Sequence, residues 1–171
     1  MRDEAVRALW QEYCEAAAAD PSSLVAVESF GDSADMADDL LALVLDGTKT
    51  ATAGLVRDYQ AAGEALPQPG GHWIALDGRG APGCVLRTSE VRVGTLTSVD
   101  EAFARDEGEG DRTREWWLEA HRRFLHRQGE GAAFDEEYDL VVFERFEVVW
   151  RSERGIERPG RPPMPGPGGA L

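Results

Sequence analysis

The sequence predicts a single α+β domain, a small mixed or antiparallel β-barrel with helices around it. A length of 171 residues suits one domain with a sizeable core. After a helix, a strand and a second helix, the remaining apolar-patterned segments are mostly strands that short helices interrupt. Regular β-α-β alternation is missing, so a doubly wound parallel sheet is not expected.

Two helices flank the first strand in the N-terminal part of the chain. Apolar residues recur at helical spacing in residues 3–19, which predicts an amphipathic helix. Residues 24–30 alternate in polarity and are predicted to form a strand. A second helix is expected from a cap at Asp32 or Ser33 to Gly47, which favours a helix end because it tolerates the left-handed conformation.

Most of the remaining chain is predicted to be extended. Residues 48–55 are rich in threonine and are expected to be extended or turn-like, and a short helix is expected within residues 57–71. Residues 72–77 and 84–93 have strand patterns separated by a glycine-rich turn, which predicts a hairpin. The last strand, or bent pair of strands, is predicted over residues 139–150.

Two more helices are expected between the hairpin and the last strand. Ser98 is predicted to cap a short helix, and Asp111 is predicted to cap the longer one that follows. We therefore expect an N-terminal helix (residues 1–20) packed on the main domain (residues 21–153). The Pro/Gly-rich tail (residues 154–171) has little to bury and is expected to be loosely attached or disordered.

Composition restricts the partners of the protein. The formal net charge is −14, which disfavours duplex DNA because broad binding to a duplex needs phosphates to be neutralised. It still allows a local cleft for a short strand or a single nucleotide. No apolar run approaches the roughly 20 residues of a membrane span, so no membrane partner is expected and a cytoplasmic location is the default expectation. The oligomeric state stays open.

Lys49 is the only lysine in a chain that is rich in arginine and has no asparagine. A coding bias that replaces lysine with arginine explains the composition but leaves this one position unexplained. A guanidinium is always charged, whereas a desolvated amine can lose its proton. The sole lysine is therefore a candidate for proton transfer or charge stabilisation.

The neighbours of Lys49 carry a family resemblance. The run LALVLDGTKTATAGL contains the pattern Gly-x-Lys-x-x-Thr at Gly47, Lys49 and Thr52. An acidic, glycine-rich run leads into a Trp-containing helix over residues 106–124. Together these segments resemble the ASCH domain of the PUA-like superfamily, in particular its longer bacterial members, over roughly residues 24–150. The fold that the resemblance implies is the small barrel predicted above.

The resemblance also implies activities and site residues. ASCH domains were proposed to bind RNA by analogy with PUA domains; some members resemble amidohydrolases that deacetylate N4-acetylcytidine, and some longer members are like ribonucleases acting on single-stranded RNA. Carried over by position, the catalytic Lys and Thr become Lys49 and Thr52. The catalytic Glu becomes Glu107, with Glu109 as the second choice. Many small members have an Arg two residues past the Thr, where this chain has Gly54.

The chemistry of these residues leaves two roles open for Lys49. As an amine it could take a proton from Thr52 or a water, and as an ammonium it could stabilise an oxyanion. Glu107 could protonate a leaving group or hold the lysine. On a regular strand residues 49 and 52 point to opposite faces, so they converge only if the chain turns after Gly47. We expect substitution of either residue by alanine to abolish turnover while leaving stability nearly unchanged.

The expected substrate-binding residues come from the motif and its neighbourhood, and they are Gly47, Thr50, Tyr59, Glu109, Arg112 and Trp116. Either Trp116 or Trp117 could stack a base, although the simpler interpretation is one core ring and one rim ring. The arginines of residues 105–127 either pair with acids at helical spacing or form a phosphate-binding rim. His121 and His126 are expected at the surface or behind the site.

Three functions remain. The first is an RNA-related hydrolase, acting on single-stranded RNA like a ribonuclease or on an RNA-derived modified nucleoside in a cleft around Lys49. The second is a non-catalytic RNA- or nucleotide-binding module, and the third is a small-molecule amidohydrolase of the N4-acetylcytidine type. No cofactor is expected, although Glu107, Glu109 and Asp111 could offer oxygens to a divalent metal.

Overall fold

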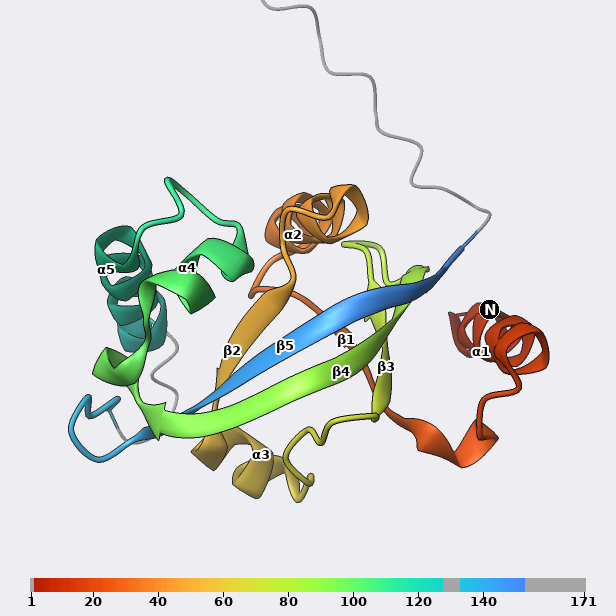
Figure 1. Ribbon diagram of the computed structural model, residues 1–171, viewed down its shortest axis with the longest axis horizontal. Helices are drawn as coiled ribbons and strands as arrows, with labels where there is room; N and C mark the ends of the chain where they lie inside the picture. The colour runs from red at the N-terminus through yellow and green to blue at the C-terminus, as the bar shows by residue number, and fades with distance from the viewer. Residues whose placement is uncertain (1, 128–132, 153–171) are drawn as a thin grey trace, which may run out of the picture.

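The computed structural model describes residues 2–127 and 133–152 and contains one five-stranded sheet with helices around it. The strand order is β1-β3-β4-β5-β2. β1 pairs with β3 in parallel, and the other neighbouring strands are antiparallel. This arrangement confirms the predicted mixed α+β fold (Figure 1). The predicted tail, residues 154–171, lies outside the described residues.

The element order follows the sequence prediction closely. The last apolar segment is one long strand rather than a bent pair, and the threonine-rich segment becomes a strand only from its fourth residue. In chain order the elements are α1 (Arg2–Ala17), a 3₁₀ turn (Pro21–Ser23), β1 (Leu24–Ser29), α2 (Ala34–Asp46), β2 (Ala51–Leu55), α3 (Val56–Ala62), β3 (His72–Leu76), β4 (Pro82–Thr95), a second 3₁₀ turn (Leu96–Ser98), α4 (Glu101–Glu107), α5 (Arg114–Arg127) and β5 (Leu140–Arg151).

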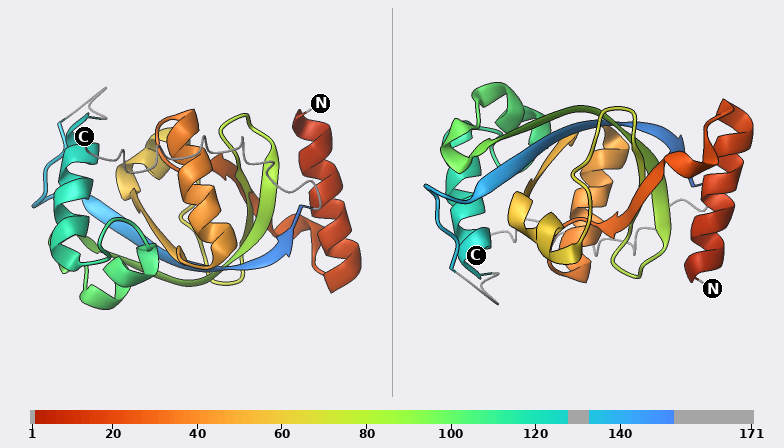
Figure 2. Two further views of the ribbon diagram at one scale, coloured as in Figure 1. Left: turned by 90° about the horizontal axis from the view of Figure 1, so that it is seen from above. Right: turned by 90° about the horizontal axis from the view of Figure 1, so that it is seen from below.

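The sheet curls into a half-barrel that stays open between β1 and β2. These two are the edge strands, and no pairing joins them within the described part of the chain. α2 covers one mouth of the curled sheet and α3 lies at the opposite mouth (Figure 1, Figure 2). α1 lies at one end of the long axis, and α4 and α5 lie at the other (Figure 1).

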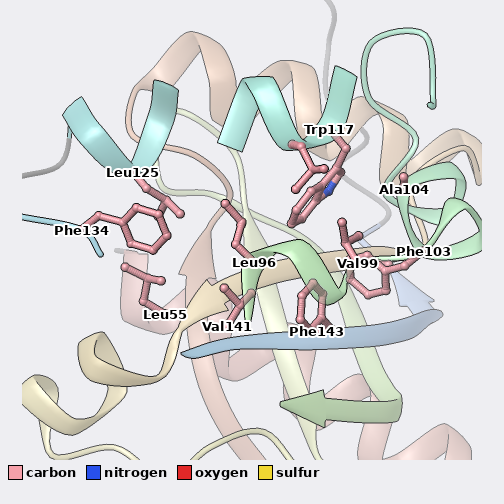
Figure 3. Close-up of a cluster of buried hydrophobic side chains, with 12 residues drawn as sticks. Leu55, Leu96, Val99, Phe103, Ala104, Trp117, Leu125, Phe134, Val141 and Phe143 are labelled. Atoms are coloured by element: carbon pink, nitrogen blue, oxygen red, sulfur yellow. The ribbon is translucent and has the colours of Figure 1, made fainter. Parts of the chain in front are cut away.

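The helix pair α4 and α5 is held against the sheet by an aromatic core. Trp117 and Leu125 point from α5 towards Val141 and Phe143 of β5 (Figure 3). Phe103 of α4 packs edge-on against Phe143, with ring centroids 5.0 Å apart. Trp117 is only 1% exposed, so this packing fixes the rotation of α5 about its axis.

At the other end of the molecule α1 packs through one apolar face. Leu9, Trp10 and Tyr13 of α1 lie in a cluster with residues of β3 and β4. The indole Nε1 of Trp10 donates to the carbonyl of Pro21 at 3.1 Å, which ties the helix to the start of the main domain. The polar tips of the two aromatic side chains are thus satisfied while their rings are buried, since the Tyr13 hydroxyl also meets a ring nitrogen of His72 at 3.0 Å.

Both predicted caps of the C-terminal helices are wrong by two residues. Asp100, not Ser98, caps α4, because its carboxylate accepts from the Phe103 N–H at 2.7 Å. Ser98 ends the preceding 3₁₀ turn instead, where its hydroxyl donates to the Thr95 carbonyl. Asp111 accepts from the N–H and hydroxyl of Thr113, whose own hydroxyl then accepts from the first turn of α5. In both places several short polar residues precede the helix, and the backbone path selects among them.

Two further features concern membranes and thiols. In the described residues, none of the helices combines the length and the apolar character that crossing a bilayer requires. Cys14 and Cys84 are both free. Burial raises the pKa of the Cys84 thiol to about 12, because the apolar core disfavours the thiolate, so this cysteine packs as a small apolar side chain.

The cap at Asp100 supplies a test of the fold. Asp100→Ala removes the acceptor for the Phe103 N–H and should lower the free energy of unfolding by about 1 kcal/mol. Asp100→Asn keeps a capping oxygen and should lower it much less, so it is the matched control. Urea denaturation measures both, and equal losses for the two variants would contradict a capping role.

Candidate functional site

Backbone hydrogen bonds hold the segment between α2 and β2 from two sides. Gly47 ends α2 in the left-handed conformation, with φ of 85°. The Lys49 N–H then donates back to the Leu43 carbonyl of α2 at 3.0 Å, and the Thr50 N–H donates to the Asp106 carbonyl of α4 at 2.7 Å. Lys49 therefore lies in a clamped turn before the regular strand begins.

A glycine at the end of α4 allows two carboxylates to approach this turn. Gly108 has φ of +74°, and a Cβ on it would lie 2.5 Å from the Thr48 carbonyl oxygen and 2.9 Å from the Lys49 nitrogen. No other residue fits such a contact without moving the backbone. The close approach places the flanking side chains, Glu107 and Glu109, beside Lys49.

The Lys49 amine is enclosed by oxygen atoms. Its Nζ lies 3.1 Å from Oε2 of Glu107 and 2.9 Å from Oε1 of Glu109, and the residue is only 1% exposed. The backbone carbonyl of Glu107 is a third acceptor at 3.4 Å. The Phe30 ring lies below the ammonium, with its centroid 5.6 Å from Nζ. An ammonium has three N–H donors, so every one of them has an acceptor here.

This environment keeps Lys49 protonated. Burial by itself lowers the pKa of the amine, but the negative charges and hydrogen bonds of Glu107 and Glu109 together outweigh it, and the pKa is raised. Of the two roles that the sequence leaves open, the arrangement favours the ammonium that stabilises negative charge over the amine that accepts a proton.

The two carboxyl groups differ although they share one lysine. Burial acts to raise the pKa of Glu107, but the charge of Lys49, with a smaller contribution from His121, lowers it overall. Burial and the neighbouring charge of Glu107 raise the pKa of Glu109, and Lys49 only partly compensates. Glu109 is also the more accessible, with its side chain 24% exposed against 2% for Glu107. Glu107 therefore holds the lysine as a fixed anion, while Glu109 is the carboxyl that more readily takes up a proton.

Lys49, Glu107 and Glu109 line a cleft between β2, α2 and α5. Its cavity volume is about 440 Å³, within the range of small-molecule sites. Thr52 lines the same cleft, so the motif Lys and the motif Thr both contribute to its wall, and their direct convergence stays a prediction. Trp116, which is half-buried, lines it from the start of α5 and packs its ring against Gly110.

Two arginines lie at the cleft, and both have acidic partners. Arg123 faces Glu119 one helical turn away at 3.7 Å, and Arg127 faces Asp32 at 3.6 Å. Both pairs are largely exposed and loose, so they cost little to open. Arg123 and Arg127 are thus paired with acids in this structure, and both stay in reach of a ligand in the cleft.

Sequence reasoning missed His121 as a cleft residue. Its Nε2 lies 3.8 Å from Oε1 of Glu107, and its ring stacks on Trp117 with centroids 3.7 Å apart. The signal was present in the helical spacing. Trp117, His121 and Leu125 follow one another at intervals of four, so a histidine between two core residues must face inwards.

Four of the expected substrate-binding residues lie outside the lining of this cleft, and one of them, Tyr59, lines a neighbouring cavity instead. Gly47 shapes the end of α2, and Thr50 is exposed, with its hydroxyl donating to the Asp106 carbonyl. Arg112 is exposed in a left-handed turn, φ 64°, and its Nε donates to the Arg105 carbonyl. These residues position the site's backbone, and contact with a substrate remains a prediction for them.

Tyr59 lies in a second cavity of about 460 Å³ that shares Phe30 and Thr52 with the first. This cavity fills the opening between the edge strands β1 and β2. The Tyr59 ring covers Gly54, because a Cβ on Gly54 would lie 3.4 Å from it. Burial, followed by Glu28 and Glu144, raises the pKa of the Tyr59 hydroxyl, which therefore stays protonated at neutral pH. The space that an Arg would occupy at position 54 is thus partly taken by an aromatic ring.

The described residues contain no group of three or more acidic, cysteine or histidine side chains placed to hold a metal ion. Asp111 does not join Glu107 and Glu109, because its carboxylate bonds to Thr113. The ammonium of Lys49 occupies the position between the two glutamates that a cation would otherwise take.

The model of the ASCH domain matches residues 26–150, well over half of the chain. The chain belongs to the ASCH domain family. The family span begins in β1 and ends in β5, so it contains nearly all of the curled sheet and every residue that lines the cleft.

Two crystal structures are similar to this ASCH protein. One is a protein from Enterococcus faecalis V583, with 32% sequence identity and a TM-score of 0.76; the match covers 86% of this chain and 90% of that one. The other is an ASCH domain from Lactobacillus crispatus JV V101, with 30% identity and a TM-score of 0.75 over 86% and 96% of the two chains. Among proteins with curated descriptions, none matches this chain significantly.

The charge state of Lys49 can be measured directly because it is the only lysine. Protein labelled with ¹³C,¹⁵N-lysine should give one side-chain Nζ signal. Since the pKa is raised above the ordinary value of 10.5, that signal should stay at the ammonium position up to about pH 10. The variant Glu109→Gln should titrate at lower pH than the parent. A midpoint below about pH 9 in the parent would restore the proton-accepting role.

The buried ion pair also predicts a stability effect, contrary to the expectation from sequence alone. Lys49→Met leaves Glu107 buried without its partner and should cost about 3–5 kcal/mol at pH 7. Folding lowers the pKa of Glu107 and raises that of Lys49. The pair therefore stabilises the fold at pH values above the ordinary pKa of glutamate, 4.5, and below that of lysine, 10.5.

The double variant Lys49→Met/Glu107→Gln is the control, since it removes the unpaired charge and should recover part of the loss. Urea denaturation at pH 7 and at about pH 4 measures the free energy of unfolding of all three proteins. The difference in this free energy between the parent and Lys49→Met should be smaller at about pH 4, because carboxylates are then protonated. A loss under about 1 kcal/mol at pH 7 would argue against an uncompensated buried charge.

Proposed function

We propose that this ASCH protein is a hydrolase that acts on an RNA-derived nucleoside, or on the end of a short single-stranded RNA, held in the cleft around Lys49. The observation that carries the proposal is the buried Lys49–Glu107–Glu109 group in a cleft that Thr52 also lines. Buried charges are expensive and add little net stability compared with apolar residues of similar size. Their presence in a cleft is typical of sites that stabilise charge during a reaction.

The size and charge of the cleft support a small ligand. A cavity of about 440 Å³ accommodates a nucleoside but not a folded RNA. The chain's net charge of −14 and the carboxylates beside Lys49 disfavour long stretches of phosphate. The loose pairs of Arg123 and Arg127 could release a guanidinium for one terminal phosphate.

The residues divide naturally into roles for hydrolysis of an amide such as that of N4-acetylcytidine. The Thr52 hydroxyl or a water attacks the carbonyl carbon, and its proton passes to a carboxylate. Glu109 suits that step better than Glu107, because its pKa is raised and it is more accessible. The developing oxyanion replaces Glu109 as an acceptor of the Lys49 ammonium. The C–N bond then breaks, and the proton reaches the leaving nitrogen. Where water is the nucleophile, acetate leaves directly; where Thr52 is the nucleophile, a water then hydrolyses the acetyl ester on Thr52 and releases acetate.

One observation favours a second candidate, a non-catalytic nucleotide-binding module. Every N–H of Lys49 already has an acceptor, so the ammonium stabilises an oxyanion only if Glu109 moves. A site that never releases Glu109 would bind a ligand through the remaining cleft residues without turning it over.

Assays with N4-acetylcytidine and with 5′-labelled single-stranded RNA separate these functions. We expect turnover of one of the two substrates, and Thr52→Ala and Lys49→Met should each lower kcat/KM by about 10²- to 10³-fold. Thr97→Ala is the matched control, because Thr97 is exposed on the second 3₁₀ turn and lies outside the cleft. RNA cleavage that persists in both cleft variants indicates a contaminating nuclease.

Binding of either ligand without turnover supports the module instead. Absence of both binding and turnover would contradict the proposal as a whole. Thr52→Ala has the further advantage that it removes no ion pair, so its loss of activity cannot be attributed to the instability expected for Lys49→Met.

A further inference from the structure

We propose that the second cavity, in the opening between β1 and β2, binds a small organic amine in its ammonium form. This cavity has a volume of about 460 Å³, and neither Lys49 nor its two glutamate partners line it. The inference therefore goes beyond the proposed function and does not depend on it. It is supported by the charge of the lining, by one buried carboxylate with a free oxygen, and by the aromatic walls.

The charged side chains that line this cavity are all acidic. They are Glu28, Glu64 and Glu144, and no lysine, arginine or histidine is among the lining residues. Partial burial and then the charge of Glu64 raise the pKa of Glu28. Burial, followed by the charges of all three glutamates, raises the pKa of the Tyr59 hydroxyl. The cavity thus has a negative potential that a bound cation would relieve.

Glu144 is the carboxylate that points to a ligand. The residue is only 5% exposed, and it lies on β5 opposite Thr52 of β2, which also lines the cavity. Its Oε1 accepts a hydrogen bond from the Thr88 hydroxyl. Its Oε2 has no hydrogen-bond partner among the described residues, yet this atom keeps some accessible surface. A largely buried carboxylate oxygen without a donor is costly, so Oε2 offers an unused acceptor to a ligand in the cavity.

The charge of Glu144 is not neutralised within the described part of the chain, where no ion pair includes this residue. Burial raises the pKa of its carboxyl, and the hydrogen bond from Thr88 only partly offsets this. The Trp73 N–H lies near enough to lower the pKa slightly, but it forms no hydrogen bond of normal geometry. A ligand ammonium at Oε2 would supply both the missing donor and the missing positive charge.

Aromatic rings form another part of the wall. Phe30, Tyr59 and Trp73 all line the cavity, and the rings of Phe30 and Trp73 meet edge-on with their centroids 5.3 Å apart. The face of an aromatic ring attracts a cation, and it does so more strongly when the cation is desolvated. The same rings can bury the apolar part of a ligand. An amine with a short hydrocarbon body therefore matches both the charge and the apolar surface of this cavity.

The lining argues against two other kinds of cation. The described residues hold no group of three or more acidic, cysteine or histidine side chains placed for a metal ion, so the three glutamates do not form a metal site. A guanidinium pairs best with a carboxylate that has both oxygens free, and Oε1 of Glu144 already bonds to Thr88. An ammonium is a compact donor that needs only one oxygen, Oε2.

Two probes of nearly equal shape test the proposal. Phenethylamine carries one ammonium at pH 7, and phenethyl alcohol is its uncharged counterpart. Isothermal titration calorimetry measures the dissociation constant of each. We expect the amine to bind with a dissociation constant below about 1 mM, and at least about tenfold more tightly than the alcohol.

Variants locate the bound amine. Glu144→Gln keeps the shape of the side chain and an oxygen for Thr88 but removes the charge, so it should weaken amine binding at least about tenfold. Glu147→Gln is the matched control and should keep the affinity, because Glu147 is exposed on the same strand and does not line the cavity. Glu28→Gln changes an exposed residue of the lining and should weaken binding about threefold.

Each outcome decides. A preference for the amine that Glu144→Gln removes and Glu147→Gln keeps supports the proposal. Equal binding of amine and alcohol overturns it, because the cavity is then only an apolar site. Amine binding that Glu109→Gln abolishes and Glu144→Gln keeps places the amine in the cleft around Lys49 and also overturns it. So does the absence of saturable binding at about 10 mM amine. Circular dichroism checks each variant, and if Glu144→Gln does not fold, the loss or retention of affinity in Glu28→Gln decides in its place.

Discussion

The rest of the site depends on one buried ammonium held between two carboxylates. Lys49 is completely enclosed, and its three donors meet Glu107 and Glu109 at hydrogen-bond distance. Such a group is stable only if the backbone places both carboxylates within hydrogen-bond distance of the ammonium, because an unpaired charge in the same place would cost several kcal/mol. Gly108 permits this placement, because without a side chain the end of α4 can contact the backbone of residues 48 and 49. The geometry is therefore a property of the contact between two chain segments that are about 60 residues apart.

The fold supports this contact by fixing the rotation of α5 about its axis. Trp117 and Leu125 anchor the helix on β5, and the same rotation directs His121 and Trp116 to the cleft. The curled sheet forms the other wall of the cleft. Within the described residues the sheet does not close between β1 and β2, and the second cavity lies in that opening. The cleft is thus bounded by rigid elements on most sides, which suits a site that must hold a small ligand in one orientation.

The electrostatics of the cleft distinguish it from an ordinary nucleic-acid surface. Its positive charge is buried and already neutralised by carboxylates, and the arginines at its edge are paired with acids. What the cleft offers to a ligand is a largely apolar lining that includes aromatic rings, with carboxylate and hydroxyl oxygens as acceptors. Such a lining recognises N–H donors and planar rings better than phosphate chains. Membership of the ASCH family identifies the scaffold, while these particular side chains set the chemistry that this chain can perform.

The sequence by itself determined the element order, the curled mixed sheet and the central position of Lys49. Apolar periodicity, the glycine that ends α2 and the Gly-x-Lys-x-x-Thr pattern are local signals. Together with the family resemblance that points to the two glutamates, they carry the elements and five residues that line the cleft: Lys49, Thr52, Glu107, Glu109 and Trp116. Caps were predicted two residues early, because Ser98 and Asp100 have similar capping propensity and only the backbone path separates them. Only the tertiary structure decided that Lys49 is a saturated ammonium, that Glu109 differs from Glu107, and that His121 faces Oε1 of Glu107. The physical reason is that charge state and hydrogen-bond partners depend on burial and on distances between segments far apart in the chain, which residue spacing does not encode.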